Sequence, residues 1–195
     1  MLSLPLIILG VAVVVVLWGI VMYNRFVRLV QQTKEAWADI DVQLKRRYDL
    51  IPNLVETVKG YASHERETLD AVTNARAEAT KMHVDASGLT PEALSAMAGA
   101  EQGLTQALGK LLAVAEAYPD LKANTNFLEL QRELSDTENK IQAARRFYNG
   151  NVRDLSIALQ QFPSNIVGNM FNFGGHQYFE LPEGSTEREP VKVSF

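Results

Sequence analysis

The strongest constraint in this sequence is an uncharged stretch that covers its first 24 residues. Within it, residues 4–23 read LPLIILGVAVVVVLWGIVMY, an almost unbroken run of apolar side chains. A bilayer hydrocarbon core about 30 Å thick is crossed by a helix of about 20 residues, which is the length of this run. Trp18 and Tyr23 lie toward its C-terminal end, where aromatic side chains favour the membrane–water interface. Residues 1–24 are therefore predicted to form a transmembrane anchor in the lipid bilayer.

Two other interpretations of this run are a cleaved signal peptide and a buried core helix. A signal peptide has a basic n-region, a shorter apolar run and a small-residue cleavage site, and the sequence shows none of the three. Valine-rich apolarity on all sides of the run favours an anchor over a core helix. We therefore expect an uncleaved, single-pass anchor.

The cations next to the run predict its orientation. No lysine or arginine precedes it, whereas Arg25, Arg28 and Lys34 follow it. Cytoplasmic flanks of membrane spans carry the excess of lysine and arginine. The N-terminus is therefore expected outside, and the remainder of the chain in the cytoplasm.

Charge and cysteine content exclude several classes of protein. The net charge of -4 leaves no basic surplus to neutralise phosphates, so no nucleic-acid partner is expected. The absence of cysteine excludes disulfides, thiolate catalysis and thiolate-bound metals.

Four helical stretches are predicted after the anchor, at about residues 24–61, 63–83, 91–118 and 126–162. Apolar or small side chains recur in the first at steps of three and four, which is typical of a coiled-coil seam. They are Phe26, Val30, Thr33, Trp37, Ile40, Leu44, Ile51, Leu54 and Val58. No strand-like alternation of useful length appears before residue 163. The expected fold is all-α: the anchor, an antiparallel bundle of about four long helices in residues 25–163, and an irregular tail in residues 164–195.

Residues typical of helix caps indicate where these helices begin and end. Gly60 is a plausible stop for the first. Ser63 is a candidate N-cap for the second, and Thr90 with Pro91 for the third. Asn126, with a glutamate three residues on, resembles the capping box of the fourth.

Two positions could interrupt these helices. Pro52 removes its own N–H and crowds the carbonyl of Tyr48, so we expect a kink there, with Asp49 or Asn53 satisfying the freed backbone. A complete break into two helices is the alternative. Residues 149–150 read Asn-Gly, a hairpin signal, but the apolar stripe keeps its phase through them, which favours one helix.

A cation falls on the apolar seam of the first helix. Extending the seam from Leu44 reaches Arg47, and counting from the distal end of the bundle puts that position near Glu101, Thr137 and Glu138. We therefore predict a buried polar network of these four residues that fixes helix register. The alternative is an arginine that snorkels to the surface.

The unequal helix lengths predict a stalk near the membrane. The first and fourth helices are longer than the second, so their seams would lack full cover in a monomer. These seams carry Phe26, Val30, Trp37, Val152, Leu155 and Leu159. Self-association is the simplest way to cover them.

The tail contains apolar and aromatic side chains that an up-down-up-down order would return to the membrane. They are Ile166, Val167, Met170, Phe171, Phe173, Tyr178 and Phe179. Together with Phe26, Val30 and Trp37 they form a candidate surface for lipid headgroups or a neighbouring protomer. The alternative is a flap over the protomer's own stalk.

No pattern of catalytic or metal-binding residues accompanies these features. The residues three before His64, His83 and His176 are Tyr61, Thr80 and Phe173, so no Glu-x-x-His motif of a di-iron bundle is present. The glycines of residues 168–175 lack a Walker lysine. We expect no cofactor, no metal and no enzymatic activity.

Several long blocks of the sequence resemble the LemA family of bacterial membrane proteins. Residues 23–65, which include KRRYDLIPNL, are similar to its opening block, and residues 111–149, 162–173 and 178–180 are similar to later ones in the same order. The resemblance covers roughly residues 20–180. It implies a helical domain anchored in the bacterial inner membrane, and it implies no established enzymatic activity.

The function expected from these observations is structural. The chain would be a single-pass scaffold whose cytoplasmic bundle forms homo-oligomers and organises membrane or protein partners. The alternative is an adaptor that docks a membrane-protein partner, such as a protease or sensor.

Overall fold

The computed structural model describes residues 4–86 and 88–180, and this part of the chain contains six helices and no strand. The helices are α1 (Leu4–Lys59), α2 (Arg66–Lys81), α3 (Pro91–Ala115), α4 (Pro119–Lys122), α5 (Thr125–Gln160) and α6 (Ser164–Met170). The expected all-α fold, with a long apolar N-terminal helix and a packed bundle, is confirmed.

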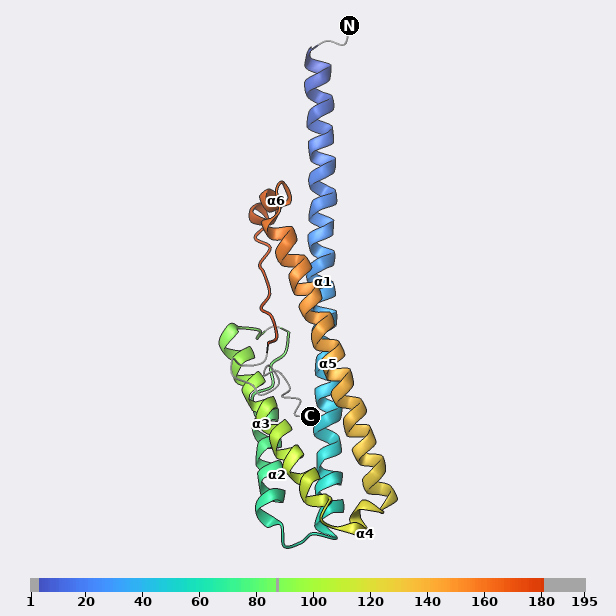
Figure 1. The fold of residues 1–195 in the computed structure, drawn as a ribbon. Coiled ribbons are helices and arrows are strands. Elements are labelled where there is room, and N and C mark those ends of the chain that lie inside the picture. Colours follow the sequence, from blue (N-terminus) through green and yellow to red (C-terminus); the bar gives the residue numbers. More distant parts are fainter. Residues whose placement is uncertain (1–3, 87, 181–195) are drawn as a thin grey trace, which may run out of the picture.

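Figure 1 shows an elongated molecule built around α1. With 56 residues, α1 is about 84 Å long at 1.5 Å per residue. Its N-terminal part stands alone, α5 lies along its middle and lower parts, and the α2–α3 hairpin covers only the lower part.

The apolar stretch of α1 is exposed along its length. It is the one described segment long and apolar enough to cross a membrane. Its side chains in residues 4–23 are exposed or only partly covered by the rest of the protein. The interpretation of this stretch as a buried core helix is therefore wrong.

The lower half of the molecule contains the larger apolar cluster, which we call the four-helix core. It is built by α1, α2, α3 and α5. Its largest fully buried members are Trp37, Ile40, Leu44, Ile51, Leu54, Met97, Leu104, Leu111, Leu121 and Tyr148. The spacing of the α1 members by three or four residues places them on one side of the helix, as the seam predicts.

A second, smaller apolar cluster, which we call the stalk cluster, lies nearer the N-terminus of α1. It consists of Phe26, Leu155, Ala158 and Val167, with Trp18, Met22, Leu29, Val30, Leu159 and Phe173 partly buried around them. Gly168 of α6 allows this packing, because a Cβ there would lie 3.0 Å from Leu159 Cδ2 and 3.3 Å from Phe26 Cζ. The stalk is thus closed by α6, which the sequence did not predict.

Residues 171–180 return from α6 along the bundle, and we call this segment the strap (Figure 1). Asn149 holds its end through two bonds: its amide donates to the Phe179 carbonyl at 3.1 Å, and its side-chain oxygen accepts from the Phe179 N–H at 2.9 Å. Tyr148 donates its hydroxyl to the carbonyl of Gln177 at 2.9 Å. Burial raises the pKa of Tyr148 to about 12, so this hydroxyl keeps its proton at neutral pH.

The strap also closes an aromatic group at the end of the four-helix core. The Phe179 ring lies 5.6 Å from the ring of Trp37, which lies 5.2 Å from that of Tyr148. The Arg145 guanidinium carbon is 4.4 Å from the centroid of the Phe179 ring, a cation–π distance. Trp37 donates its indole N–H to the carbonyl of Val84 at 3.2 Å.

These contacts correct the expectation of an uncovered stalk. Phe26, Trp37, Val152 and Leu155 are fully buried within one protomer, and the half-buried Val30 and Leu159 pack beside them. The reason is that α6 and the strap occupy the place that α2 and α3 leave empty. The irregular tail expected from residue 164 was wrong for α6, and residues 181–195 lie outside the described residues.

Several predicted helix ends were also wrong. The cap of α5 is Asn124 rather than Asn126, since the Asn124 side chain accepts from the N–H of Phe127 at 3.0 Å. Helix α2 begins after Glu65 without a side-chain cap, so Ser63 is not its N-cap. The third predicted stretch extends to about residue 118, whereas α3 ends at Ala115 and Pro119 begins the short α4.

Other predicted ends agree with the structure. Thr90 caps α3, accepting from the N–H of Ala93 at 3.2 Å, and α1 ends at Lys59 just before Gly60. Helix α5 passes through Asn149 and Gly150 without a turn.

Candidate functional site: a buried ionic cluster, an adjoining groove and the stalk

The four-helix core contains one buried ionic cluster, centred on Arg47 of α1. Arg47 Nη1 lies 3.1 Å from Glu101 Oε2 of α3 and 3.3 Å from Glu138 Oε2 of α5. The side chains of Arg47 and Glu101 are 4% and 9% exposed, whereas that of Glu138 is 35% exposed. One guanidinium thus joins three helices, with Glu138 at the side that faces solvent. Because the arginine is buried, it does not snorkel to the surface.

Two hydroxyl groups complete this cluster. Tyr48, the next residue on α1, donates its hydroxyl to Glu101 Oε1, and Thr105 Oγ1 lies 2.7 Å from Arg47 Nη2. Thr137 does not take part as predicted: it is buried, but its hydroxyl donates to the carbonyl of Glu133 in its own helix at 2.7 Å. Thr105 lies one turn after Glu101 on α3, close enough to reach Arg47. It therefore makes the hydroxyl contact that was predicted for Thr137.

Burial dominates the protonation of this cluster. It raises the pKa of Glu101, while the Tyr48 hydrogen bond and the Arg47 charge act in the opposite direction. Burial and the neighbouring Glu101 carboxylate raise the pKa of Tyr48, so Tyr48 remains a hydrogen-bond donor at physiological pH. A carboxylate removed from water is costly unless it is paired and hydrogen-bonded. Arg47 and Tyr48 offset only part of this cost for Glu101.

Pro52 explains a second polar contact of the same α1 segment. Helix α1 continues through Pro52, so the alternative of a complete break is wrong. Proline lacks the N–H that would reach the carbonyl of Tyr48. Arg76 of α2 supplies the missing donor, since its Nε lies 2.7 Å from that oxygen. The partner is therefore a side chain from the neighbouring helix and not Asp49 or Asn53 as expected.

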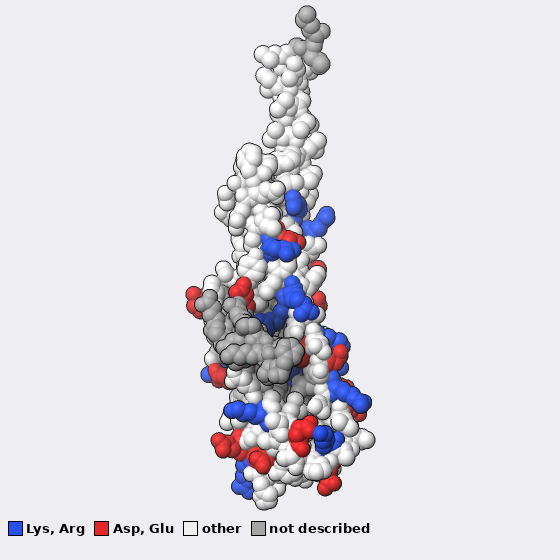
Figure 2. Space-filling view, in the orientation of Figure 1, with Lys and Arg blue, Asp and Glu red and all other residues white. Residues whose placement is uncertain are grey.

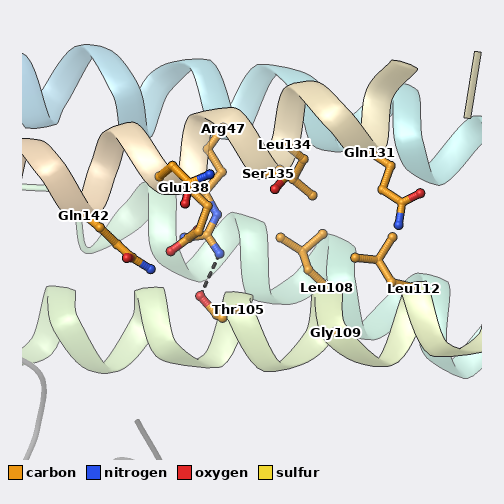
Figure 3. A pocket seen from close by; sticks show the side chains of 11 residues that line it. Arg47, Thr105, Leu108, Gly109, Leu112, Gln131, Leu134, Ser135, Glu138 and Gln142 are labelled. Atoms are coloured by element: carbon orange, nitrogen blue, oxygen red, sulfur yellow. Dashed lines mark hydrogen bonds and ion pairs between the residues drawn. The ribbon is translucent and has the colours of Figure 1, made fainter. Parts of the chain in front are cut away.

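A groove of about 420 Å³ opens beside the ionic cluster, between α3 and α5 (Figure 3). Helix α3 contributes Thr105, Leu108, Gly109 and Leu112; helix α5 contributes Gln131, Leu134, Ser135, Glu138, Asn139 and Gln142; and Arg47 comes from α1. The Nε of Arg47 is buried and has no hydrogen-bond partner within the described residues. The groove thus combines apolar walls with amides, hydroxyls and one cation, which suits a docking surface better than a catalytic site.

The other end of the molecule is free of charge over two separate stretches. Residues 4–24 and 155–179 contain no aspartate, glutamate, lysine or arginine. Figure 2 shows the consequence on one face, where the upper end of the rod is white and the charged side chains gather below it. Arg25 and Arg28 are the first cations below the apolar stretch.

The residues predicted to contact membrane or a neighbour fall into two groups. Buried ones are Phe26, Trp37, Val167 and Phe179, and half-buried ones are Val30 and Phe173. Exposed ones are Ile166, Met170, Phe171 and Tyr178. Only this last group is available to another molecule, since the first holds α6 and the strap against α1 and α5.

The described residues contain no group of three or more histidine, cysteine, aspartate or glutamate side chains placed to hold a metal ion. His83, just after α2, instead lies 2.5 Å from Asp41 of α1. This pair links α1 to the residues that follow α2, at the rim of the four-helix core.

Comparison with protein-family models matches residues 36–195 to the LemA family. This region contains the ionic cluster, the α3–α5 groove, α6 and the strap. The chain belongs to the LemA family. The resemblance seen in its sequence blocks is thereby confirmed.

Curated relatives of this LemA-family chain carry two kinds of name. Magnetosome protein MamQ 2 of Paramagnetospirillum magneticum is 26% identical over 184 residues, which cover 84% of this chain and 67% of the relative. Magnetosome protein MamQ of Magnetospirillum gryphiswaldense is 25% identical over 182 residues, with the same two coverages. Protein LemA of Metamycoplasma hominis is 27% identical over 171 residues, covering 88% of this chain and 74% of the relative. None of these names states a reaction.

Proposed function

We propose that this LemA-family protein is a non-catalytic, single-pass membrane scaffold whose helical domain self-associates. One observation carries the proposal: α1 is a single helix from its exposed apolar stretch to Lys59, inside the four-helix core. With no loop or linker between the two parts, the core is held at a set distance and direction from the bilayer. Such coupling suits a protein that acts by position and contact.

The proposed membrane is the bacterial inner membrane, with the N-terminus outside and the four-helix core in the cytoplasm. Arg25, Arg28 and Lys34 after the apolar stretch support this orientation. The relatives named as magnetosome proteins support a role in a cellular structure, because their names refer to a structure and not to a reaction. Thiol labelling of single cysteines at Val42 and Leu4 in intact cells tests the orientation, since this chain has no other cysteine. Labelling of position 42 from outside the cell would contradict the proposed orientation and indicate the opposite one.

Self-association needs a surface other than the stalk seam, because that seam is covered within the protomer. Candidates are the exposed apolar side chains of α5 and its C-terminal end: Phe147 is 59% exposed, Ile157 52% and Phe162 76%. Isolated apolar side chains are common on protein surfaces, but three along α5 and its C-terminal end offer a contact for a second copy.

The particle mass of the full chain in mild detergent tests this function. We expect a homomeric particle, and we expect the double variant Phe147→Ser with Ile157→Ser to shift it toward the monomer. Val42→Ser is a matched control, because Val42 is 60% exposed but lies on α1. A monomer at every protein concentration would contradict the scaffold.

The α3–α5 groove favours a second function, that of an adaptor for another membrane protein. Its occupant would lie against Leu112 and Ser135 and place an acceptor near the unpartnered Arg47 Nε. A photo-crosslinker at position 135 separates the two functions. A product of two copies of this chain supports the scaffold, whereas a product with a different membrane protein supports the adaptor.

A further inference from the structure

Helix α6 lies beside the last turns of the apolar stretch of α1, and a groove of about 580 Å³ separates them. One wall of this groove belongs to α1, with Val15, Val16, Trp18, Gly19, Ile20 and Tyr23. The opposite wall belongs to α6 and the start of the strap, with Ile166, Val167, Met170 and Phe171. No lining side chain is charged. Whatever surrounds the apolar stretch of α1 therefore also meets α6.

The position of α6 along α1 can be compared with the dimensions of a bilayer. Val16 precedes Arg25, the first cation, by nine residues, or about 13 Å of helix. One leaflet contributes about 15 Å of the hydrocarbon core. If Arg25 lies at the headgroups, the end of α6 that meets Val16 reaches well into the leaflet on that side.

Aromatic contacts fix α6 and the strap at this height. The Phe171 ring lies 4.9 Å from the ring of Tyr23 in an edge-to-face arrangement, and the Phe173 ring stacks on that of Phe26 at 5.1 Å. Gly168 brings α6 into contact with Phe26 and Leu159. The segment is thus packed against the stalk and does not project freely.

The backbone of this segment is largely satisfied by its own carbonyls, as burial in lipid requires. The N–H groups of Asn165 and Ile166 donate to Gln161 and Pro163 at the start of α6. At its end, Phe173 donates to Gly168 and Asn172 to Asn169, with Asn172 at a φ of 53°. This is a Schellman motif, which satisfies the last carbonyls of a helix.

Polar side chains in the segment are few and partly satisfied. Ser164 is buried and its hydroxyl donates to the carbonyls of Ala158 and Gln161. Asn165, Asn169 and Asn172 are the remaining amides. Asn169 and Asn172 are exposed, whereas the side-chain oxygen of Asn165 is buried without a partner among the described residues. The two exposed amides favour a position at the boundary between headgroups and acyl chains, where they reach water, and not at the centre of the bilayer.

Three apolar side chains of α6 and the start of the strap stay at least half exposed, although they line the groove that faces α1. Ile166 is 50% exposed, Met170 69% and Phe171 52%. Leaving three such groups in water, next to an apolar helix, would forgo the stabilisation that burial provides.

We propose that α6 is a second membrane contact: Ile166, Met170 and Phe171 insert among the acyl chains of the leaflet on the Arg25 side. The occupant of the groove is then lipid, because six of its ten lining residues belong to the apolar stretch that lipid would surround. The chain would hold one leaflet at two places, the span and α6. This proposal depends on the span being in the membrane, which the experiment below controls for separately.

Single-cysteine variants of the full chain, labelled with the environment-sensitive dye NBD, test this contact, since the chain has no cysteine of its own. The protein is placed in vesicles of phosphatidylethanolamine and phosphatidylglycerol, with and without brominated acyl chains that quench NBD. Test positions are Ile166 and Met170. Val13, in the apolar stretch, is the positive control, and Phe147, as exposed as α6 but on the four-helix core, is the negative control.

We expect bromolipid to quench positions 166 and 170 to at least about half the extent seen at position 13, as for a segment 5–10 Å below the headgroup boundary. Position 147 should stay unquenched. Positions 166 and 170 that behave like 147 while 13 is quenched would overturn the proposal and leave the span intact. If positions 166 and 170 are not quenched by bromolipid but show energy transfer between labelled copies, a second protomer covers α6 and the lipid contact is overturned. Failure to quench 13 would instead contradict the membrane anchor itself.

Discussion

The four-helix core and the stalk cluster pack against the same helix, α1, but with different elements and different kinds of side chain. In the core, α2, α3 and α5 surround α1, and a buried arginine with two carboxylates lies among them. In the stalk only α5 remains beside α1, and a seven-residue helix with an irregular strap replaces the other two. No charged residue occurs in the stalk cluster. A buried ion pair can specify how helices align, whereas apolar packing next to a membrane carries no cost of removing charge from water.

Because of this difference, the two regions should respond differently to substitutions. The core depends on a polar network that is strongly destabilised if one member is removed. The stalk depends on close packing around one glycine, and the end of the strap is held at the four-helix core by the two hydrogen bonds of one asparagine. Four changes test this contrast, and they are best made in the full chain in one detergent.

The largest effect is expected in the core. Replacing Glu101 by leucine leaves Arg47 buried, with the partly exposed Glu138 as its one remaining carboxylate partner among the described residues. Removal of one partner of a buried pair costs about 3–5 kcal/mol of unfolding free energy. Denaturant unfolding followed by circular dichroism measures it. Asp136→Ala, which breaks the exposed pair of Asp136 with Lys140, is the control and should cost far less, because solvent screens an exposed pair. Equal costs would remove the distinction between the ionic cluster and surface pairs.

Gly168→Val should produce the largest change in the stalk. A Cβ at this position meets Leu159 and Phe26, and overpacking of this kind costs about 1–3 kcal/mol. Gly150→Ala is the control on α5, because nothing lies within 4 Å of its Cβ position. Alanine at a free helical position stabilises by about 0.5–1 kcal/mol. Melting temperatures should therefore move in opposite directions, and a shift in the same direction would show that α6 does not pack as described.

Asn149→Ala should release the strap. The change removes both bonds to the backbone of Phe179, worth about 1–2 kcal/mol in total. Hydrogen exchange at the Phe179 amide should accelerate, while amides of the four-helix core keep their protection. Asn139→Ala, an exposed asparagine on the same helix, is the control. Faster exchange throughout the core would mean that the strap and the core unfold together.

The smallest effect concerns pH. Burial raises the pKa of Glu101 in the folded protein, so the folded state holds this proton more tightly than the unfolded chain does. Stability contributed by the proton is present below the unfolded pKa of about 4.3 and is lost as pH rises through the folded pKa. Glu101→Gln should flatten the dependence of melting temperature on pH in this range. An unchanged profile would assign the dependence to other groups.

The sequence was most informative where a pattern is local. Apolar spacing predicted the long helices, and the neighbours Thr90 and Pro91 predicted the start of α3. The prediction that Arg47 lies near Glu101 and Glu138 needed only helix geometry, because all three fall on regular helices at countable positions. Whether the cluster sets helix register stays a prediction, and Arg47→Met with disulfide scanning of helix pairing would test it.

The contacts that sequence reasoning missed are made by polar side chains that lie off the apolar stripes, or by the strap, which has no period of its own. The donor to the Tyr48 carbonyl is Arg76, an arginine on the polar-looking α2. The strap is held by Asn149, whose neighbour Gly150 suggested a turn instead. One signal was available: residues 155–179 contain no charge, which is unusual for a solvated tail. It indicated burial or lipid, but it could not say how much of the segment would fold back on its own protomer.

The central claim is that one continuous helix connects a membrane-embedded stretch to the four-helix core. A nitroxide scan of single cysteines along α1, from position 8 to position 58, in lipid vesicles tests it most directly. Collision with oxygen and with a water-soluble nickel complex should show lipid exposure up to about Tyr23, a boundary near Arg25 and Arg28, and then a 3.6-residue period of burial that continues past Pro52. Water exposure throughout positions 8–22, or loss of the period between the span and position 58, would contradict the account.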